Sequence, residues 1–334
     1  MERACLVKGI ILGLYNDFSC LAGNCNYTCC SGWRIAVSGK DFDRFKNIKD
    51  QALRNDILSN IYEAGGRKYF ATKSGGRCSM LDSGGLCHIQ KNAGEGMLCN
   101  TCRKFPRLVS KHNGLVWISM AASCPVTSDY IVNKEIEFYM LGNNGDISVI
   151  QVQNIPFIAG GIQECTEIFQ KYMTNRKTGQ DYINMYKLFM EIADNVLGVI
   201  IENRGIIYLE GCFDYFEEEK SAGQVISQFK EFDNVFRKEH GSVLMNYLKY
   251  RIFSRYLEMP EEKESGRKNQ VFGEMALIYI VALSRYFTFS AKETKRGRTD
   301  LETIINWVYR LCVHSLSAGI KLHDYFNRQR RKPL

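Results

Sequence analysis

Cysteine is the residue type through which this sequence could do chemistry. The chain of 334 residues carries 13 cysteines, and ten of them fall within residues 1–124. Thiolates at short spacing are soft ligands that select zinc, or iron held in an iron–sulfur cluster. The sequence therefore predicts a metal centre in this segment. The cysteines concerned form a tight first group, Cys20, Cys25, Cys29 and Cys30, and a second group, Cys78, Cys87, Cys99, Cys102 and Cys124.

The adjacent pair Cys29 and Cys30 constrains how a metal could be held. Neighbouring side chains in extended backbone point to opposite sides, so both thiols reach one ion only with strain. Either the two serve different sites, or one ligates and the other packs as a small hydrophobic side chain. Four-cysteine zinc sites usually show a pair of Cys-x2–4-Cys knuckles, and this spacing does not supply two clean ones. The pattern favours a cluster or a polynuclear site.

Charge and hydropathy set the surroundings of the cysteines. Residues 1–135 hold 18 Lys and Arg against 11 Asp and Glu, a net charge of +7. This excess suits bound thiolates, and it is equally compatible with a solvated basic surface. The N-terminal residues show no cleavable leader, and the longest apolar stretch, Met275–Leu283, is too short to span a bilayer. We expect a cytoplasmic protein without a membrane partner, whose thiols stay reduced rather than form disulfides.

The cysteine segment resembles the start of the flagellin lysine-N-methylase (FliB-like) family. The resemblance begins with Tyr15-x-Asp17-Phe18-x-Cys20 and includes Gly32-Trp33 after the cysteine pair. It continues through Gly85-Leu86-Cys87-x-Ile89 and Thr101-Cys102-x-x-Phe105-Pro106-Arg107, and it ends at Ser123-Cys124-Pro125. The same core is similar to a broader class of small zinc- or iron-chelating proteins. These motifs cover about residues 15–125, and no motif is recognised in residues 126–334.

The resemblance implies transfer of methyl groups from S-adenosylmethionine (SAM) to lysine side chains of flagellin or another protein. It also implies an iron–sulfur cluster, expected to be 4Fe-4S, with zinc as the alternative metal. Cys99 matches no family cysteine, so we expect it to take no part in the centre. The cysteines that match the family pattern are Cys20, Cys25, Cys29, Cys30, Cys78, Cys87, Cys102 and Cys124.

A few other residues are candidates for the site. Asp17 is the one carboxylate within the matched motifs, which makes it a weak candidate for the catalytic base, with a turn or cap role as the alternative. Arg107 could pair with the carboxylate of SAM or form a structural salt bridge. His88 follows Cys87 and is an alternative ligand. Trp33 and Phe105 are expected to pack over the metal and exclude water. The remaining cysteines, Cys5, Cys165, Cys212 and Cys312, are expected to be ordinary buried residues.

Several familiar fingerprints are absent from the sequence. There is no G-x-G-x-x-G after a predicted strand, no GxxxxGK[ST], no HExxH and no Cys-x3-Cys-x2-Cys run. SAM would therefore bind through an architecture for which the sequence shows no known motif. No predicted helix carries a Lys/Arg stripe with interleaved aromatic residues, so we expect no nucleic-acid partner.

The elements that must position these residues change along the chain. We predict a mainly α (α+β) protein, with an irregular cysteine-rich metal-binding module in residues 1–155 and a helical domain in residues 160–334. In the first part we expect a helix over 41–63 and strands near 115–120 and 147–152. In the second part, apolar stripes predict helices near 183–197, 225–236, 243–252 and 271–287, a polar linker over 258–270, and a helix after a capping box at Thr299–Glu302.

Two other classes of function remain open at this point. An iron–sulfur electron-transfer or redox protein would also use many cysteines, although a simple carrier would not need a large helical domain. A zinc-stapled interaction module without methyltransferase activity would explain the cysteines as structural. A reversible redox couple without methyl transfer would favour the first, and colourless protein containing only zinc would favour the second.

Overall fold

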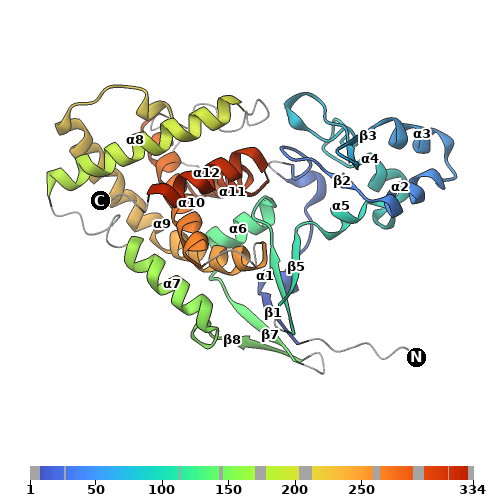
Figure 1. Ribbon diagram of the computed structural model, residues 1–334, viewed down its shortest axis with the longest axis horizontal. Coiled ribbons are helices and arrows are strands. Elements are labelled where there is room, and N and C mark those ends of the chain that lie inside the picture. Colours follow the sequence, from blue (N-terminus) through green and yellow to red (C-terminus); the bar gives the residue numbers. More distant parts are fainter. Residues whose placement is uncertain are drawn as a thin grey trace.

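The computed structural model describes residues 8–25, 28–112, 114–142, 146–169, 178–202, 213–258, 264–288, 297–314 and 316–329 (Figure 1). The strands are β1 (Gly9–Leu12), β2 (Ala36–Val37), β3 (Ile61–Ala64), β4 (Arg67–Phe70), β5 (Arg107–His112), β6 (Leu115–Met120), β7 (Phe138–Leu141) and β8 (Ile147–Ile150). The shorter helices are α1 (Leu14–Asp17), α2 (Gly39–Lys46), α3 (Gln51–Ser59), α4 (His88–Ala93), α5 (Asn100–Lys104) and α6 (Pro125–Asn133). The longer helices are α7 (Pro156–Phe169), α8 (Gly179–Glu202), α9 (Ala222–Glu258), α10 (Glu264–Thr288), α11 (Gly297–Tyr309) and α12 (Leu316–Gln329).

A five-stranded sheet joins the start of the chain to its middle, with strand order β5-β6-β1-β7-β8. Strand β1 lies at its centre, parallel to β6 and antiparallel to β7. Gly9 makes the β1–β6 approach possible, because a Cβ at this position would lie 2.5 Å from the carbonyl oxygen of Val116. The strands predicted near 115–120 and 147–152 are both confirmed, as β6 and β8.

The segment that carries most of the cysteines forms a small layer of its own. Strands β2, β4 and β3 make a three-stranded sheet, and α2 to α5 surround it at one end of the molecule, away from α7 and α8 (Figure 1). The predicted helix over 41–63 is wrong in its middle and at its end. Asn47 ends α2, Asp50 caps α3 by accepting the backbone N–H of Leu53, and residues 61–64 form β3. An Asp side chain placed to cap a new helix favours this break.

From Pro156 onward, every regular element in the described residues is helical, so the mainly α (α+β) class is confirmed. The two stripes predicted near 225–236 and 243–252 lie on one continuous helix, α9. Two expectations are wrong. Residues 264–270 belong to α10 rather than to a polar linker, and α11 begins at Gly297, so Thr299 lies inside its first turn instead of capping it.

The described residues form two separate apolar cores. One core joins the large sheet to the helical half, so that Trp117, Phe138 and Phe253 are packed together. A second core lies inside the small layer, around Phe45 and Phe70. The division of the chain near residue 155 therefore stays a prediction. In the described part of the chain, no helix combines the length and the apolar character that a membrane crossing would require.

A fully buried ion pair lies inside the helical half. The Arg251 Nε donates to a Glu274 carboxylate oxygen at 2.6 Å, and both side chains are 0% exposed. The same carboxylate accepts hydrogen bonds from Tyr247 at 2.8 Å and from Gln270 at 3.1 Å. The guanidinium also lies 5.1 Å from the ring centre of Tyr309. Every oxygen of this carboxylate thus has a partner, which offsets the cost of removing two charges from water.

Glu274→Gln should destabilise the protein strongly, because it removes the carboxylate charge that pairs with the buried Arg251 guanidinium. We expect a loss of about 3–5 kcal/mol in the free energy of unfolding. Urea denaturation followed by circular dichroism measures this loss. The matched control is Glu135→Gln, which breaks the exposed pair with Lys249 and should cost at most about 1 kcal/mol. Equal losses for the two variants would contradict this account.

Candidate metal centre and its cleft

The cysteines come together in two neighbouring thiol groups. The open thiol group, Cys20, Cys25, Cys29 and Cys124, lines a cleft of about 340 Å³. The closed thiol group surrounds a cavity of about 10 Å³, and its members are Cys30, Cys78, Cys87, Cys99 and Cys102. Cys30, Cys87 and Cys102 border both spaces and so form the wall between them. None of these nine cysteines forms a disulfide.

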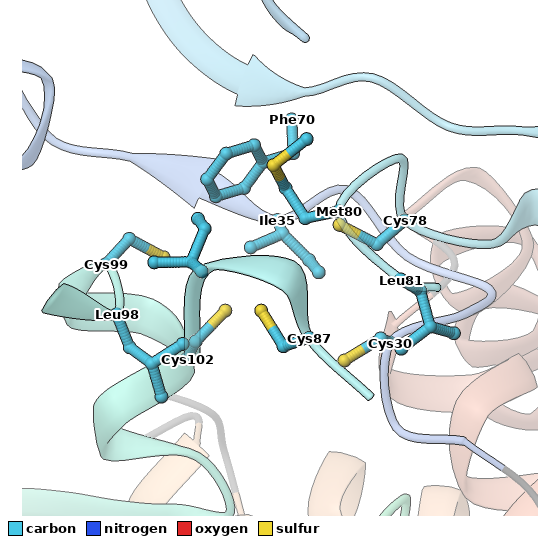
Figure 2. Close-up of a pocket in the computed structure, with 11 residues that line it drawn as sticks. Cys30, Ile35, Phe70, Cys78, Met80, Leu81, Cys87, Leu98, Cys99 and Cys102 are labelled. Carbon is cyan, nitrogen blue, oxygen red and sulfur yellow. The ribbon is translucent and has the colours of Figure 1, made fainter. Parts of the chain in front are cut away.

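The closed thiol group is built from four short segments of the small layer. Figure 2 shows the sulfurs of Cys87 and Cys102 turned toward one another, with Cys30 and Cys78 on the opposite side of the cavity from Cys99. Cys30 and Cys78 are held together by their backbones, because the Cys78 N–H donates to the Cys30 carbonyl at 2.8 Å. The rest of the lining is apolar: Ile35, Phe70, Met80, Leu81, Ile89 and Leu98.

Three of the cysteines stand immediately before a helix: Cys87 before α4, Cys99 before α5 and Cys124 before α6. Burial raises the pKa of the Cys87 and Cys124 thiols. The backbone N–H groups in the first turn of each following helix oppose that rise, although none makes a full capping hydrogen bond. Backbone donors that face a sulfur favour its thiolate form, which is the form that binds metal.

The two sulfurs of the cysteine pair lie close together, because residues 29–30 form a bend rather than the extended backbone that would point them to opposite sides. The Cys29 and Cys30 sulfurs are 3.9 Å apart. The Cys29 thiol donates to Cys30, which raises the pKa of Cys29 and lowers the pKa of Cys30 to about 7. Gly32 follows with a φ of +81°, a left-handed conformation that favours glycine, and its N–H donates to Gly76.

Burial opposes ionisation of two further thiols, one in each group. Burial raises the pKa of Cys25 to about 11 and that of Cys78 to about 12, and neighbouring cysteines add to both rises. A soft cation would remove this penalty, because metal binding displaces thiol protons. Within the described ranges, no three Cys, His, Asp or Glu side chains already stand at the spacing of a bound metal ion. The donor chemistry nevertheless fits a thiophilic metal.

Arg310, a residue of the helical half, contacts both chain segments that carry the open thiol group. Arg310 opens a π-helix, Arg310–His314, between α11 and α12. Its guanidinium donates to the carbonyls of Thr28 at 2.8 Å, Ser31 at 3.0 Å and Ser123 at 3.1 Å. The cysteine pair lies between the first two carbonyls, and Cys124 follows the third. Arg310 therefore fixes these loops relative to each other, and no sequence signal pointed to it.

Arg310→Met should loosen the open thiol group. Loss of three charge-assisted hydrogen bonds should lower the free energy of unfolding by about 3 kcal/mol or more, and it should reduce the bound metal. Metal analysis and urea denaturation measure the two effects. Arg103→Met is the matched control, since Arg103 is an exposed cation on the cleft wall. Metal retention in the Arg310 variant equal to that of the control would contradict the role of this residue.

Aromatic rings cover the cysteine pair from the side of the helical half. The Trp33 indole donates to the Cys29 carbonyl at 2.8 Å, and its ring lies 5.8 Å from Phe105 and 5.1 Å from His314. His314 Nε2 lies 2.6 Å from the Ser123 hydroxyl. Burial, with a smaller contribution from Arg310, lowers the pKa of His314 to about 4. A neutral imidazole thus packs behind the centre, and Trp33 and Phe105 border the cleft.

His314 should make the folded state sensitive to acid. Its folded pKa lies below its unfolded value, so the unfolded chain takes up a proton first as the pH falls through 6.5. We expect a loss of about 2 kcal/mol between pH 7 and pH 5, measured by urea denaturation. His314→Gln should remove this part of the loss, and His323→Gln should leave it. An unchanged pH dependence in His314→Gln would contradict the assignment.

The other candidate residues differ in whether they line the cleft. Arg107 borders the cleft, with its guanidinium 5.1 Å from the ring centre of Phe18 and 5.8 Å from that of Tyr15. Asp17 is exposed at the end of α1 and is not among the lining residues, whereas Glu95 is. Sequence reasoning missed Glu95, which lies in a Gly-rich segment without periodicity.

The remaining cysteines and the histidine stand apart from both thiol groups. His88 pairs with Asp56 at 2.7 Å and borders neither the cavity nor the cleft. Cys165 and Cys312 are buried, as expected for ordinary core cysteines. Cys5 and Cys212 lie outside the described residues.

Comparison with known proteins places the chain in a family. Over 121 residues the chain is 30% identical to the flagellar biosynthetic protein FliU of Salmonella muenchen, a match that spans 72% of FliU and 35% of this chain. The chain belongs to the family of FliU. It is also 30% identical to the lysine-N-methylase of Salmonella choleraesuis and 29% identical to that of Salmonella typhimurium, each over 121 residues.

The short length of the match limits what can be inferred about activity from this family membership. The match spans 30% of the length of either lysine-N-methylase, so the activity of those proteins does not pass to this chain by similarity alone. No family model and no solved structure matches the chain.

Proposed function

We propose that the chain is a SAM-dependent protein-lysine N-methyltransferase, acting on flagellin, whose cysteines hold an iron–sulfur cluster. The observation that carries the proposal is the similarity to lysine-N-methylases in a chain whose thiols line one cleft. A cleft of about 340 Å³ lies within the size range of small-molecule sites. The reduced thiols suit the cytoplasm as the compartment.

The open thiol group is the part of the cysteine set best placed to hold the cluster. Its members reach the cleft from two separated parts of the chain, Cys20 to Cys29 and Cys124, so a polynuclear group could be ligated there and still face a substrate. Trp33, Phe105 and Leu86 provide apolar surface on the same cleft and would exclude water from it. The bound cluster would supply a Lewis-acidic or redox-active iron beside the cleft.

The charged residues of the wall suit the two substrates. Arg107, held by two aromatic rings, is positioned to pair with a carboxylate such as that of the methyl donor. SAM supplies an electrophilic methyl group on a sulfonium. A target lysine must be neutral to attack that carbon, because only the free amine has a lone pair. Glu95 is the wall carboxylate that would accept the ammonium proton.

The direct test is methyl transfer by anaerobically purified protein. Incubation with SAM and flagellin, followed by mass spectrometry, should show +14 Da per methyl group on lysines, a mass shift fixed by replacing one hydrogen with CH3. The matched control omits SAM. Unmodified flagellin together with a reversible redox couple would replace the proposal with an electron-transfer function. Unmodified flagellin with zinc alone would replace it with an interaction module.

The two carboxylate candidates can be separated with a pair of substitutions. Glu95→Gln should lower the rate of methyl transfer by roughly 100-fold or more, because a general base contributes about that factor. Asp17→Asn is the matched control and should keep nearly the full rate, since Asp17 does not line the cleft. Initial rates between pH 6 and pH 9 give the measurement. A large loss in Asp17→Asn with none in Glu95→Gln would reverse the assignment.

A further inference from the structure

The closed thiol group has a different shape from the open one. Its cavity of about 10 Å³ offers room for about one water-sized atom. The cavity wall supplies thiols and apolar side chains, so a water molecule there would lack the polar partners that it needs. A soft metal ion would have such partners, because each thiol can lose a proton to solvent and bind it.

The size of this cavity favours a single ion over a cluster. An iron–sulfur cluster contains several iron and sulfide atoms and needs far more space than one atom. The cleft beside the open thiol group, at about 340 Å³, has that space. Four thiolates around one ion are instead the arrangement of closed structural zinc sites.

We propose that Cys30, Cys78, Cys87 and Cys102 form a second, separate metal centre that holds one tetrahedral ion of the zinc type. This inference deepens the proposed function and rests on it only in that the cysteines bind metal. The eight matched cysteines then divide into two sets of four, with the cluster on the open thiol group. The boundary runs through the cysteine pair, so that Cys29 serves one centre and Cys30 the other.

The surroundings of the closed thiol group fit a structural ion. Cys78 is 6% exposed, and it belongs to the core of the small layer together with Phe45, Ile57 and Phe70. The ion would therefore tie the loops around β4 to α4 and α5. Four thiolates on a divalent ion leave a net charge of −2, and the Arg310 guanidinium acts electrostatically on Cys30. Cys99 lies beside Cys102 and completes the wall as a fifth thiol.

The test counts metals in the full chain, purified anaerobically, and in single variants. The wild-type protein should hold about one zinc ion in addition to iron and acid-labile sulfide. Cys87→Ser and Cys102→Ser should lose the zinc and keep the iron and sulfide. Cys20→Ser and Cys25→Ser should lose iron and sulfide and keep the zinc. Cys99→Ser should keep both metals, and Cys165→Ser, a buried cysteine in another core, is the matched control and should do the same. Parallel loss of both metals from both classes of variant would overturn the inference in favour of one polynuclear site.

Cobalt provides a second readout that does not depend on folding of the closed-group variants. Cys20 is exposed and Cys25 half-buried, so serine at these positions leaves the apolar core of the small layer intact. Protein produced with cobalt should show the absorption of tetrahedral cobalt bound by four thiolates, and Cys20→Ser should retain it. Disappearance of this absorption in Cys20→Ser would overturn the inference. Methyl transfer is measured separately, so that the two proposals can fail independently. Zinc retained by protein that does not methylate flagellin would support the second centre and contradict only the proposed function. Protein that methylates flagellin but holds no zinc ion would contradict only the second centre.

Discussion

Desolvation of thiols is the constraint on which the small layer of this protein depends. Nine cysteines are gathered around one cleft and one adjoining cavity, and burial raises the pKa of Cys25 to about 11 and that of Cys78 to about 12. Thiols are weak hydrogen-bonding groups, so their convergence contributes little to stability unless a cation replaces their protons. The backbone N–H groups in the first turns of α4 and α6 lower the pKa of the preceding Cys87 and Cys124, which favours this replacement.

The helical half explains how loops without much secondary structure can hold such a centre. Arg310 and His314 come from a π-helix between α11 and α12, and together they contact the cysteine-pair loop and the Ser123 segment. Such π-helical irregularities occur frequently at functional sites. The large sheet and the long helices share one apolar core, which fixes this π-helix relative to β6 and α6. The helical half is thus the rigid support of the cleft.

Features that depend on residues close together in the sequence could be predicted, and those that depend on distant residues could not. The apolar run of strand β6 and the cysteine spacing are both local features, so both were visible in the sequence. Arg310 lies 282 residues from Thr28, and its role exists only once the chain has folded. Glu95 begins a short 3-10 helix, Glu95–Met97, in a Gly-rich segment where no periodicity marks a side chain. The site assignments among the cysteines, including the exclusion of Cys99, stay predictions.

The two thiol groups also give meaning to the cysteine pair. A residue pair at the boundary of two centres can give one thiol to each centre. The spacing in the sequence did not distinguish this arrangement from one in which one cysteine ligates and the other packs as a small hydrophobic side chain. The most direct measurement of the central claim is anomalous diffraction from anaerobically grown crystals at the iron and zinc absorption edges. The account predicts an iron signal in the cleft beside Cys20, Cys25, Cys29 and Cys124, and a separate zinc signal inside the closed thiol group. A crystal with no metal signal at either position, in protein that still methylates flagellin, would contradict it.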